Sequence, residues 1–431
     1  MKKSKKLLSI LLSLALILCI LPATAFALDD NETDIINVPC VTRVTPTTIT
    51  VKAIDGVQYR LGSNGTWTSD SVFSGLYPNT SYEVFYRIGT GAATSLGNTI
   101  TPASQNHADQ SFIDTDAPYT MEYKGFAVSL QLESDLTLRY YLKTNKVDDE
   151  GFTNIRIYTE RQFYDTGSNT YTWKSKVIYP QSGTYQYGGS SRYLFLYPGL
   201  ASCDMCDTVN VTLYAEKDGK TYIAPIVSGS FAEYAASGFS GSNASMNRLI
   251  ADLLNYGAAS QTYFDYHTSQ LASSYLGSYS SYATSTMPTL NQCNNIVSTV
   301  SNPLATFTSY TLALDNKISM NIYVNLDSSL SPSNVRLKVN YTSIFGNAVN
   351  DTYSLTGNNY FSINKMSPVE FSQPFTFTVY NGNTPISESV QYSFEHRCRS
   401  GINNAGDNVT LKNLLIALMK YSRSASAYFV N

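Results

Sequence analysis

The stretch LIADLLNYGAASQTYF at residues 249–264 returns near the C-terminus as LLIALMKYSRSASAYF at residues 414–429. In the first stretch the large apolar residues Leu249, Leu253 and Tyr256 recur at the spacing of one helix face, and the second stretch repeats them. Both stretches therefore predict amphipathic helices. Because a long segment with the alternating pattern of β-strands precedes each helix, the repeat indicates one β-rich module used twice.

The strands that open the two modules support this repeat. The alternating strand that begins at Val128 matches the one that begins at Tyr310, which lies 182 positions later, whereas the two helices are 165 positions apart. The first module therefore carries 17 additional residues, the difference between these two offsets. We place the additional residues in its hairpins around residues 164–187, because loops absorb insertions more easily than strands do.

The first residues have the three parts of a secretory signal peptide. A basic segment with Lys2, Lys3, Lys5 and Lys6 precedes an apolar run at residues 7–21 and the small-x-small cleavage site Ala25-Phe26-Ala27. An apolar run of about 15 residues is short for a membrane span, which needs about 20. We therefore expect a secreted, extracellular protein with no membrane span in the mature chain.

Charge limits the partners that the protein can have. Charged residues make up only 14% of the chain, against about 25% in an average domain. Removing the four lysines of the signal peptide from the formal net charge of -3 leaves -7. Since nucleic acids require a basic surface, we exclude nucleic acid as a partner.

Five cysteines remain after the predicted cleavage, at positions 40, 203, 206, 293 and 398. An odd number scattered over about 400 residues is not a disulfide framework. The closest pair, Cys203 and Cys206, has the spacing of a redox pair or of half a zinc site. The sequence supplies no matching second pair, and the motif precedes a strand. We therefore predict a local disulfide or two free thiols, with no metal and no cofactor.

The small β-module near the N-terminus carries a recognisable turn. The segment Leu76-x-Pro78-x-Thr80-x-Tyr82 resembles the tyrosine-corner segment of fibronectin type III domains. The resemblance implies a β-sandwich in which the tyrosine hydroxyl bonds back to the backbone of the turn. It covers about 65 residues, and it implies a spacer or binding module without catalytic residues.

The two larger modules also resemble a known kind of unit. The segment LNYGAASQTYF at residues 254–264 is similar to the signature that ends an uncharacterised secreted β-rich module of anaerobic Gram-positive bacteria. The second copy departs from that signature, with Ser422-Arg423-Ser424 in place of Gly-Ala-Ala. The resemblance implies no known chemistry.

These patterns predict a mainly β protein, because a sheet with one apolar face must be covered. We expect a small fibronectin-like β-sandwich and two β-sandwich-like modules, each closed by its C-terminal amphipathic helix. The predicted organisation is a signal peptide at 1–27, a fibronectin type III-like module at 39–104, a first β-rich module at 123–266 with its helix at 245–265, a connector at 267–303 with a short helix in its second half, and a second β-rich module at 304–431 with its helix at 409–429.

The residues with catalytic potential form no recognisable motif. The three histidines are His107, His267 and His396, and none stands in an HExxH arrangement. The run Asp148-Asp149-Glu150 is typical of a solvated turn, although paired carboxylates also serve glycosidases and calcium sites. We therefore predict no catalytic residues and no enzymatic activity.

Aromatic residues are crowded into the hairpin region of the first module. Aromatic rings stack on sugar rings, whereas cross-strand aromatic pairs stabilise any sheet. The candidate ligand-binding residues are Tyr164, Tyr171, Trp173, Tyr185 and Tyr187.

We predict a non-catalytic binding or adhesion protein with a polysaccharide or cell-wall component as its partner. The alternatives are a glycan-acting hydrolase with an unrecognised site and a purely structural spacer. The ligand and the oligomeric state do not follow from the sequence.

Overall fold

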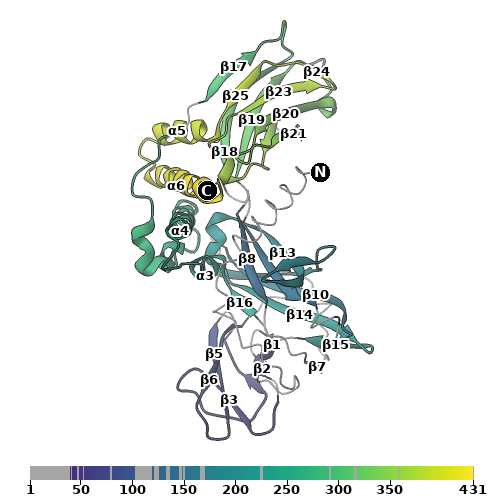
Figure 1. The fold of residues 1–431 in the computed structure, drawn as a ribbon, viewed down its shortest axis with the longest axis vertical. Coiled ribbons are helices and arrows are strands. Elements are labelled where there is room, and N and C mark those ends of the chain that lie inside the picture. Colours follow the sequence, from purple (N-terminus) through teal and green to yellow (C-terminus); the bar gives the residue numbers. More distant parts are fainter. Residues whose placement is uncertain are drawn as a thin grey trace.

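The computed structural model describes residue 39 and residues 41–430 with short gaps. The gaps are residues 46–47, 52, 78–79, 102–118, 121–125, 133–135, 145–147, 149–150, 166–169, 224–226, 291–292, 315–317 and 358. The predicted signal peptide, His107 and Cys40 lie outside the described residues. Within these residues the protein is mainly β, and its long helices lie between two sets of sheets (Figure 1). No helix of this described part is long and apolar enough to cross a membrane.

Two small antiparallel sheets form the N-terminal part of the described chain. One sheet joins β1 (Val41–Thr45), β2 (Thr48–Val51) and β4 (Val72–Ser74), and the other joins β3 (Val57–Leu61), β5 (Ser81–Ile88) and β6 (Thr94–Ile100). Their apolar side chains form a separate core around Ile49, Tyr59 and Val84. The backbone N–H of Tyr77 donates a 2.9 Å hydrogen bond to the hydroxyl of Tyr82. This is the contact that the tyrosine-corner motif implies.

The elements from β7 to α4, here called copy 1, form two sheets. The first has the order β11 (Thr170–Ile178), β10 (Thr153–Asp165), β14 (Val209–Lys217), β15 (Lys220–Ile223) and β7 (Tyr119–Thr120), and β16 (Val227–Gly229) also pairs with β14. The second has the order β12 (Tyr185–Tyr187), β13 (Ser190–Leu200), β9 (Leu136–Lys143) and β8 (Ala127–Leu132). The helical segments of copy 1 whose bounds the structure describes are η3 (Ser202–Cys206), α3 (Phe231–Ala236) and α4 (Ala244–Phe264).

The elements from β17 to α6, here called copy 2, also form two sheets. The first has the order β17 (Asn294–Ser298), β25 (Ser389–Tyr392), β23 (Phe375–Asn381), β20 (Val335–Thr342) and β21 (Ala348–Ser354), and β24 (Thr384–Pro385) also pairs with β23. The second joins β18 (Ala305–Ala313), β19 (Ser319–Leu326) and β22 (Tyr360–Ile363). The helical segments are η5 (Pro332–Asn334), η6 (Pro368–Glu370), α5 (Phe394–Asn404) and α6 (Val409–Val430).

The strand orders show that copy 1 and copy 2 are an internal repeat. The order β11-β10-β14-β16 corresponds to β21-β20-β23-β25, and β13-β9-β8 corresponds to β22-β19-β18. The short helix that follows the first sheet begins in the same way in both copies. Ser230 and Ser393 each accept, through the side chain, the backbone N–H three residues further on.

The additional residues of copy 1 lengthen its strands. Strand β10 has 13 residues and β11 has 9, whereas β20 has 8 and β21 has 7. Strand β12 has no counterpart among the described residues of copy 2. The additional residues lie in the predicted hairpin region, but they extend strands there as well as loops. A hairpin can grow at its tip because each added pair makes its own ladder of hydrogen bonds.

The two long helices α4 and α6 pack side by side between the copies (Figure 1). Tyr256 and Tyr421, which occupy equivalent positions 165 residues apart, stack with ring centroids 5.7 Å apart and an interplanar angle of 7°. Contact between equivalent residues is the mark of a two-fold arrangement. Each helix therefore covers the other copy as well as its own, whereas the sequence predicted a cap for its own module.

Helix α4 is capped at its N-terminus and packs closely against the 3-10 helices of its surroundings. The side chain of Asn243 accepts the backbone N–H of Met246 at 3.0 Å, which caps the helix. Gly257 lies against η3, where an added Cβ would overlap the sulfur of Met205 and approach the Cβ of Ala272 at 3.1 Å. The small residue at this position therefore allows the close approach.

The connector between the copies is docked on the two helices. A 3-10 helix, η4 (Ala272–Tyr282), lies in its first half, while β17 in its second half joins the sheet of copy 2, where a short helix was predicted. The buried carboxylate of Asp252 on α4 accepts the backbone N–H of Thr284 at 2.8 Å. Lys420 of α6 donates to the carbonyl of Ser285 at 3.1 Å.

Candidate functional site

Three of the five aromatic residues predicted to bind a ligand lie on the hairpin of β10 and β11. Tyr164 lies directly opposite Tyr171, and Trp173 lies opposite Gln162. This hairpin belongs to the region in which the strands of copy 1 are longer than those of copy 2. The side chains of these three aromatic residues lie outside the described part of the structure, so their role stays a prediction.

Tyr185 and Tyr187 lie two residues apart on β12 and therefore on the same face of the strand. Tyr185 is 37% exposed. The ring of Tyr187 stacks on Tyr141 of β9, with centroids 4.5 Å apart and an interplanar angle of 23°. Sequence analysis did not select Tyr141. The alternation of β9 could have placed it on the sheet face opposite the core residue Tyr140, where the ring of Tyr187 covers it and it is only 4% exposed.

The outer face around Tyr141 is basic. Arg139 and Lys143 lie two residues on either side of it, and Arg192 of β13 lies opposite Lys143. The guanidinium of Arg139 donates to the Gln131 side chain at 2.8 Å. The guanidinium of Arg192 lies 5.3 Å from the ring centroid of Tyr187, and burial lowers its pKa. This face therefore combines the ring of Tyr187, which covers the buried Tyr141, with cationic side chains.

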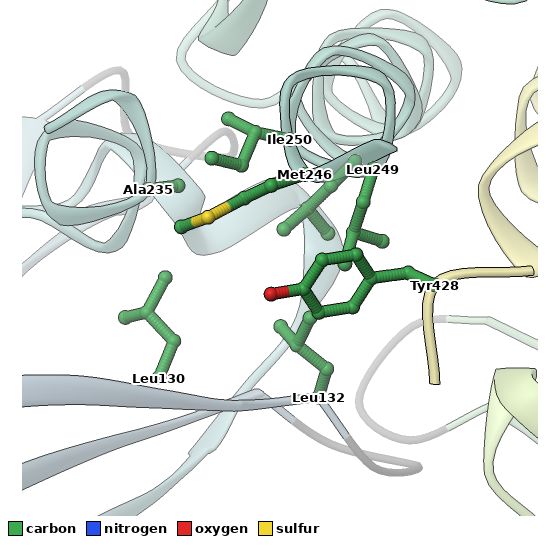
Figure 2. Close-up of a pocket in the computed structure, with 8 residues that line it drawn as sticks. Leu130, Leu132, Ala235, Met246, Leu249, Ile250 and Tyr428 are labelled. Carbon is green, nitrogen blue, oxygen red and sulfur yellow. The ribbon is translucent and has the colours of Figure 1, made fainter. Parts of the chain in front are cut away.

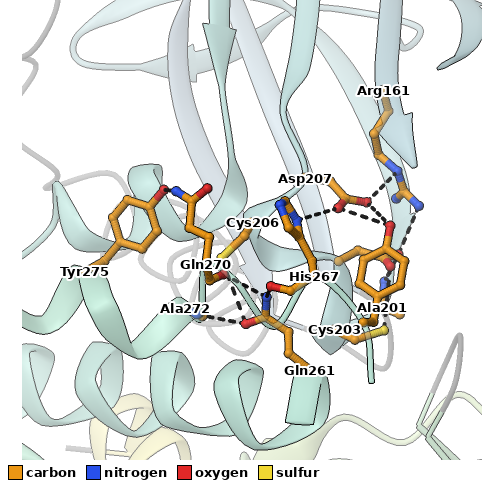
Figure 3. Close-up of polar contacts among 12 residues, drawn as sticks. Arg161, Ala201, Cys203, Cys206, Asp207, Gln261, His267, Gln270, Ala272 and Tyr275 are labelled. Atoms are coloured by element: carbon orange, nitrogen blue, oxygen red, sulfur yellow. Dashed lines mark hydrogen bonds and ion pairs between the residues drawn. The ribbon is translucent and has the colours of Figure 1, made fainter. Parts of the chain in front are cut away.

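A buried polar cluster lies where η3 meets β10 and the start of the connector (Figure 3). Nη2 of Arg161 lies 3.0 Å from Oδ2 of Asp204, and its Nε lies 3.5 Å from Oδ2 of Asp207. The hydroxyl of Tyr266 donates to Oδ2 of Asp207 at 2.9 Å, and Nδ1 of His267 lies 3.6 Å from Oδ1 of that carboxylate. Sequence analysis missed this cluster because its members are far apart in the chain and match no motif.

The cluster joins elements together. Burial raises the pKa of Asp207 to about 6, against the opposing effects of the hydrogen bond with His267 and the charge of Arg161. Asp204 also accepts the backbone N–H of Ala201 at 3.0 Å. The two buried carboxylates share the single positive charge of one guanidinium, and the charge of Asp204 adds to the rise in the pKa of Asp207. The arrangement fixes η3 to β10 and to the connector, and it differs from an open pair of glycosidase carboxylates.

Cys203 and Cys206 are free, buried thiols on η3. Burial raises the pKa of Cys206 to about 12 and that of Cys203 further. Protonated thiols are poor nucleophiles and poor metal ligands. Of the two predicted alternatives, the structure shows two free thiols. Within the described ranges no group of three or more His, Cys, Asp or Glu residues is placed to hold a metal ion.

A network around Gln261 lies beside these thiols. The Gln261 side chain accepts the backbone N–H of Ala272 at 2.8 Å and donates to the carbonyl of Gln270 at 3.0 Å. The sulfur of Cys206 lies 4.0 Å from the same side-chain oxygen. Gln261 therefore ties the end of α4 to the start of η4.

The remaining residues with catalytic potential make structural contacts. Asp148 is exposed and accepts a 2.7 Å hydrogen bond from the hydroxyl of Tyr193, whereas Asp149 and Glu150 lie outside the described residues. The ring of His396 on α5 lies 5.1 Å from that of Tyr392. Burial and the neighbouring Arg397 lower the pKa of His396.

A small apolar cavity lies at the contact between the copies (Figure 2). Its volume is about 20 Å³, which is room for about one water molecule. Tyr428 of α6 reaches into it from copy 2, towards Leu130 and Leu132 of β8. The other lining residues are Ala235, Met246, Leu249, Ile250 and Leu253. The cavity is a packing defect of the interface and is too small for an organic ligand.

Comparisons with known proteins find similar solved structures but no matching family. No protein-family model matches the chain, and no curated protein matches it. One similar solved structure is the tetra-tandem repeat in the extending region of a large adhesion protein, at 10% identity over 82% of this chain and 71% of that one, with a TM-score of 0.15. Another is the three N-terminal domains of the bacteriophage RB49 highly immunogenic outer capsid protein, at 9% identity over 84% and 98%, with a TM-score of 0.13. These TM-scores are too low to support a shared fold.

Proposed function

We propose that the protein is secreted and acts outside the cell as a non-catalytic binding protein for a polysaccharide or a cell-wall component. In this proposal a fibronectin type III-like module precedes two β-sandwich modules of the kind found in anaerobic Gram-positive bacteria. The observation that supports a binding role is the pair of tyrosines on β12, where Tyr185 is exposed and Tyr187 is partly exposed and stacks on the buried Tyr141.

The chemistry of this face suits a sugar polymer. Aromatic rings offer flat apolar surfaces to sugar rings, and polar side chains beside them hydrogen-bond the hydroxyls. In the strand register Ser190 lies opposite Tyr187 and Arg192 lies opposite Tyr185, so a hydroxyl and a guanidinium lie beside the two rings. In the proposal the hairpin residues Tyr164, Tyr171 and Trp173 also take part in binding.

The packing of the two copies supports a binding role in a second way. The helices α4 and α6, with Tyr256 stacked on Tyr421, place one continuous core between the copies. Such a core holds the faces of both copies at fixed positions. Rigid presentation lowers the entropy that a protein loses when it binds an extended ligand.

The test is retention of residues 28–431 on insoluble polysaccharides and on purified bacterial cell wall. We expect retention, and we expect the double change Tyr171→Ala and Trp173→Ala to reduce it. Tyr77→Ala is the matched control, because Tyr77 is 75% exposed in the N-terminal sheets. Release of soluble sugar from the polymer would instead indicate a hydrolase. No retention on any glycan would favour a spacer and would contradict the proposal.

A further inference from the structure

The second sheet of copy 2 has an outer face that sequence analysis did not consider. On β19 the core residues Met320, Ile322 and Val324 are almost fully buried, so the residues between them face the other side of the sheet. On β22 the core residues are Phe361 and Ile363. The outer face of these two strands is therefore made by Asn321, Tyr323, Asn325, Tyr360 and Ser362.

Two tyrosines lie at the centre of this face. Tyr323 lies directly opposite Tyr360 in the strand register, and their ring centroids are 5.2 Å apart with an interplanar angle of 38°. Both side chains are half-buried. On the other side of Tyr323 its partner in β18 is Ser309, which is exposed. The two rings therefore form one aromatic surface that crosses the middle of the sheet.

Amides and hydroxyls lie in the neighbouring rows. Asn321 lies between Thr311 of β18 and Ser362 of β22, and Asn325 is exposed opposite Thr306. The side-chain oxygen of Asn321 has no hydrogen-bond partner among the described residues. An acceptor left without a donor is unfavourable, and rotation of the amide towards a ligand hydroxyl would satisfy it.

The sheet that carries this face is uncharged. The strands Ala305–Ala313, Ser319–Leu326 and Tyr360–Ile363 contain no Asp, Glu, Lys, Arg or His. The first charged residue after β19 is Asp327, beyond the end of the strand. Anionic ligands are held by cationic groups, which these strands lack. The face therefore complements a ligand with flat apolar surfaces, many hydroxyls and no charge.

From these observations we infer that the outer face of β18, β19 and β22 is a second binding site, which takes a neutral polysaccharide. The rings of Tyr323 and Tyr360 stack on sugar rings, and the amides of Asn321 and Asn325 hydrogen-bond their hydroxyls. The inference rests on the proposed binding function but uses residues of the other copy. With both sites on one rigid body, the protein can hold a polymer at two points.

The test compares residues 28–431 with the double variant Tyr323→Ala, Tyr360→Ala in affinity electrophoresis through soluble neutral and anionic polysaccharides. We expect the unmodified chain to be retarded by a neutral polymer, and we expect the dissociation constant of the variant to rise about tenfold or more. The variant Tyr323→Phe, Tyr360→Phe keeps both rings and should bind like the unmodified chain. If the alanine variant has a lowered melting temperature, Ser309→Asp, an exposed change beside Tyr323, replaces it and should weaken binding similarly.

The outcomes separate this inference from the proposed function. Loss of binding in the tyrosine variant, with normal binding by Tyr77→Ala, supports the second site. Retention lost only when Tyr171 and Trp173 are changed would overturn the second site and keep the proposed function. Retardation by anionic polymers alone would overturn the neutral class of ligand. Absence of binding to every polysaccharide would overturn both proposals.

Discussion

The outer faces of copy 1 and copy 2 have the same geometry and opposite chemistry. In each, one strand presents three outward residues around a central tyrosine. Copy 1 places Arg139, Tyr141 and Lys143 there, with Tyr141 buried beneath Tyr187. Copy 2 presents Asn321, Tyr323 and Asn325, each 182 positions later. The repeat therefore keeps the aromatic centre and exchanges two cations for two amides. A scaffold that fixes backbone positions allows the ligand chemistry to change without a change of fold.

The buried ends of the same sheets differ as well. By strand register, Arg161 of β10 corresponds to Tyr341 of β20. Copy 1 holds two carboxylates with this arginine. In copy 2 the matching 3-10 segment carries Glu370, whose carboxylate accepts the backbone N–H of Ile344 at 2.8 Å. Both solutions satisfy buried carboxylates, but only the first depends on a partner side chain.

The largest expected effect on stability comes from removing the guanidinium of Arg161. Arg161→Met leaves Asp204 and Asp207 buried without their guanidinium, and it should lower the free energy of unfolding by about 3–5 kcal/mol. The matched change Tyr341→Met in copy 2 should cost about 1 kcal/mol, because it leaves no buried charge. Urea denaturation measures both. Equal decreases in the free energy of unfolding for the two variants would show that the ion pairs of Arg161 do not make copy 1 more sensitive than copy 2.

The second effect is a pH dependence of stability. Asp207 has its pKa raised from 3.8 to about 6 in the folded protein, a difference of about 3 kcal/mol at roughly 1.4 kcal/mol per pH unit. Since the folded pKa lies above the unfolded value, the protonated form favours folding. This contribution is fully present below pH 3.8 and is lost as the pH rises to about 6.

The effect is measured by melting temperatures between about pH 3.5 and about pH 6.5, a range that includes the unfolded and the folded pKa of Asp207. Asp207→Asn cannot ionise and should flatten this part of the curve. Asp148→Asn, a change at an exposed carboxylate, should leave the curve as it is. An unchanged curve in Asp207→Asn would assign the pH dependence to another group.

A smaller effect concerns the helices that the copies share. Gly257→Ala places a methyl group against the sulfur of Met205, and overpacking of this kind costs about 1–3 kcal/mol. At the equivalent position of copy 2, Ser422 already has a side chain and donates to the carbonyl of Pro368 at 2.7 Å. Ser422→Ala should cost about 1 kcal/mol through this lost hydrogen bond. Chemical denaturation would contradict the comparison if Gly257→Ala were neutral.

The smallest expected effect on stability belongs to a pair of substitutions that should change ligand binding. The double change Asn321→Arg, Asn325→Lys gives copy 2 the outward charges of copy 1, and surface changes of this kind alter stability by about 0.5 kcal/mol or less. Affinity for neutral polysaccharide should fall, and weak binding to anionic polysaccharide should appear and decrease with added salt. Unchanged affinity for both polymers would show that this face binds neither.

Part of the fold could be predicted because it follows from local patterns. Leu253 and Tyr256 lie at helical spacing, and the alternation of β9 and β19 assigns one face of each strand to the core. The repeat was visible because both patterns return in the same order. The candidate site was only partly predictable. Tyr187 was selected for its place in an aromatic cluster, but its stacking partner Tyr141 lies on a strand that is distant in sequence.

The sequence by itself determined the mainly β fold, the repeat and the two amphipathic helices, because periodicity and burial are properties of neighbouring residues. Only the tertiary structure decided where the helices lie. An amphipathic pattern indicates that one face of a helix is buried, but it does not indicate which part of the protein buries that face. Here α4 and α6 cover each other through Tyr256 and Tyr421. The cluster around Arg161 and the outer pair Tyr323 and Tyr360 likewise exist only once distant strands are brought into register.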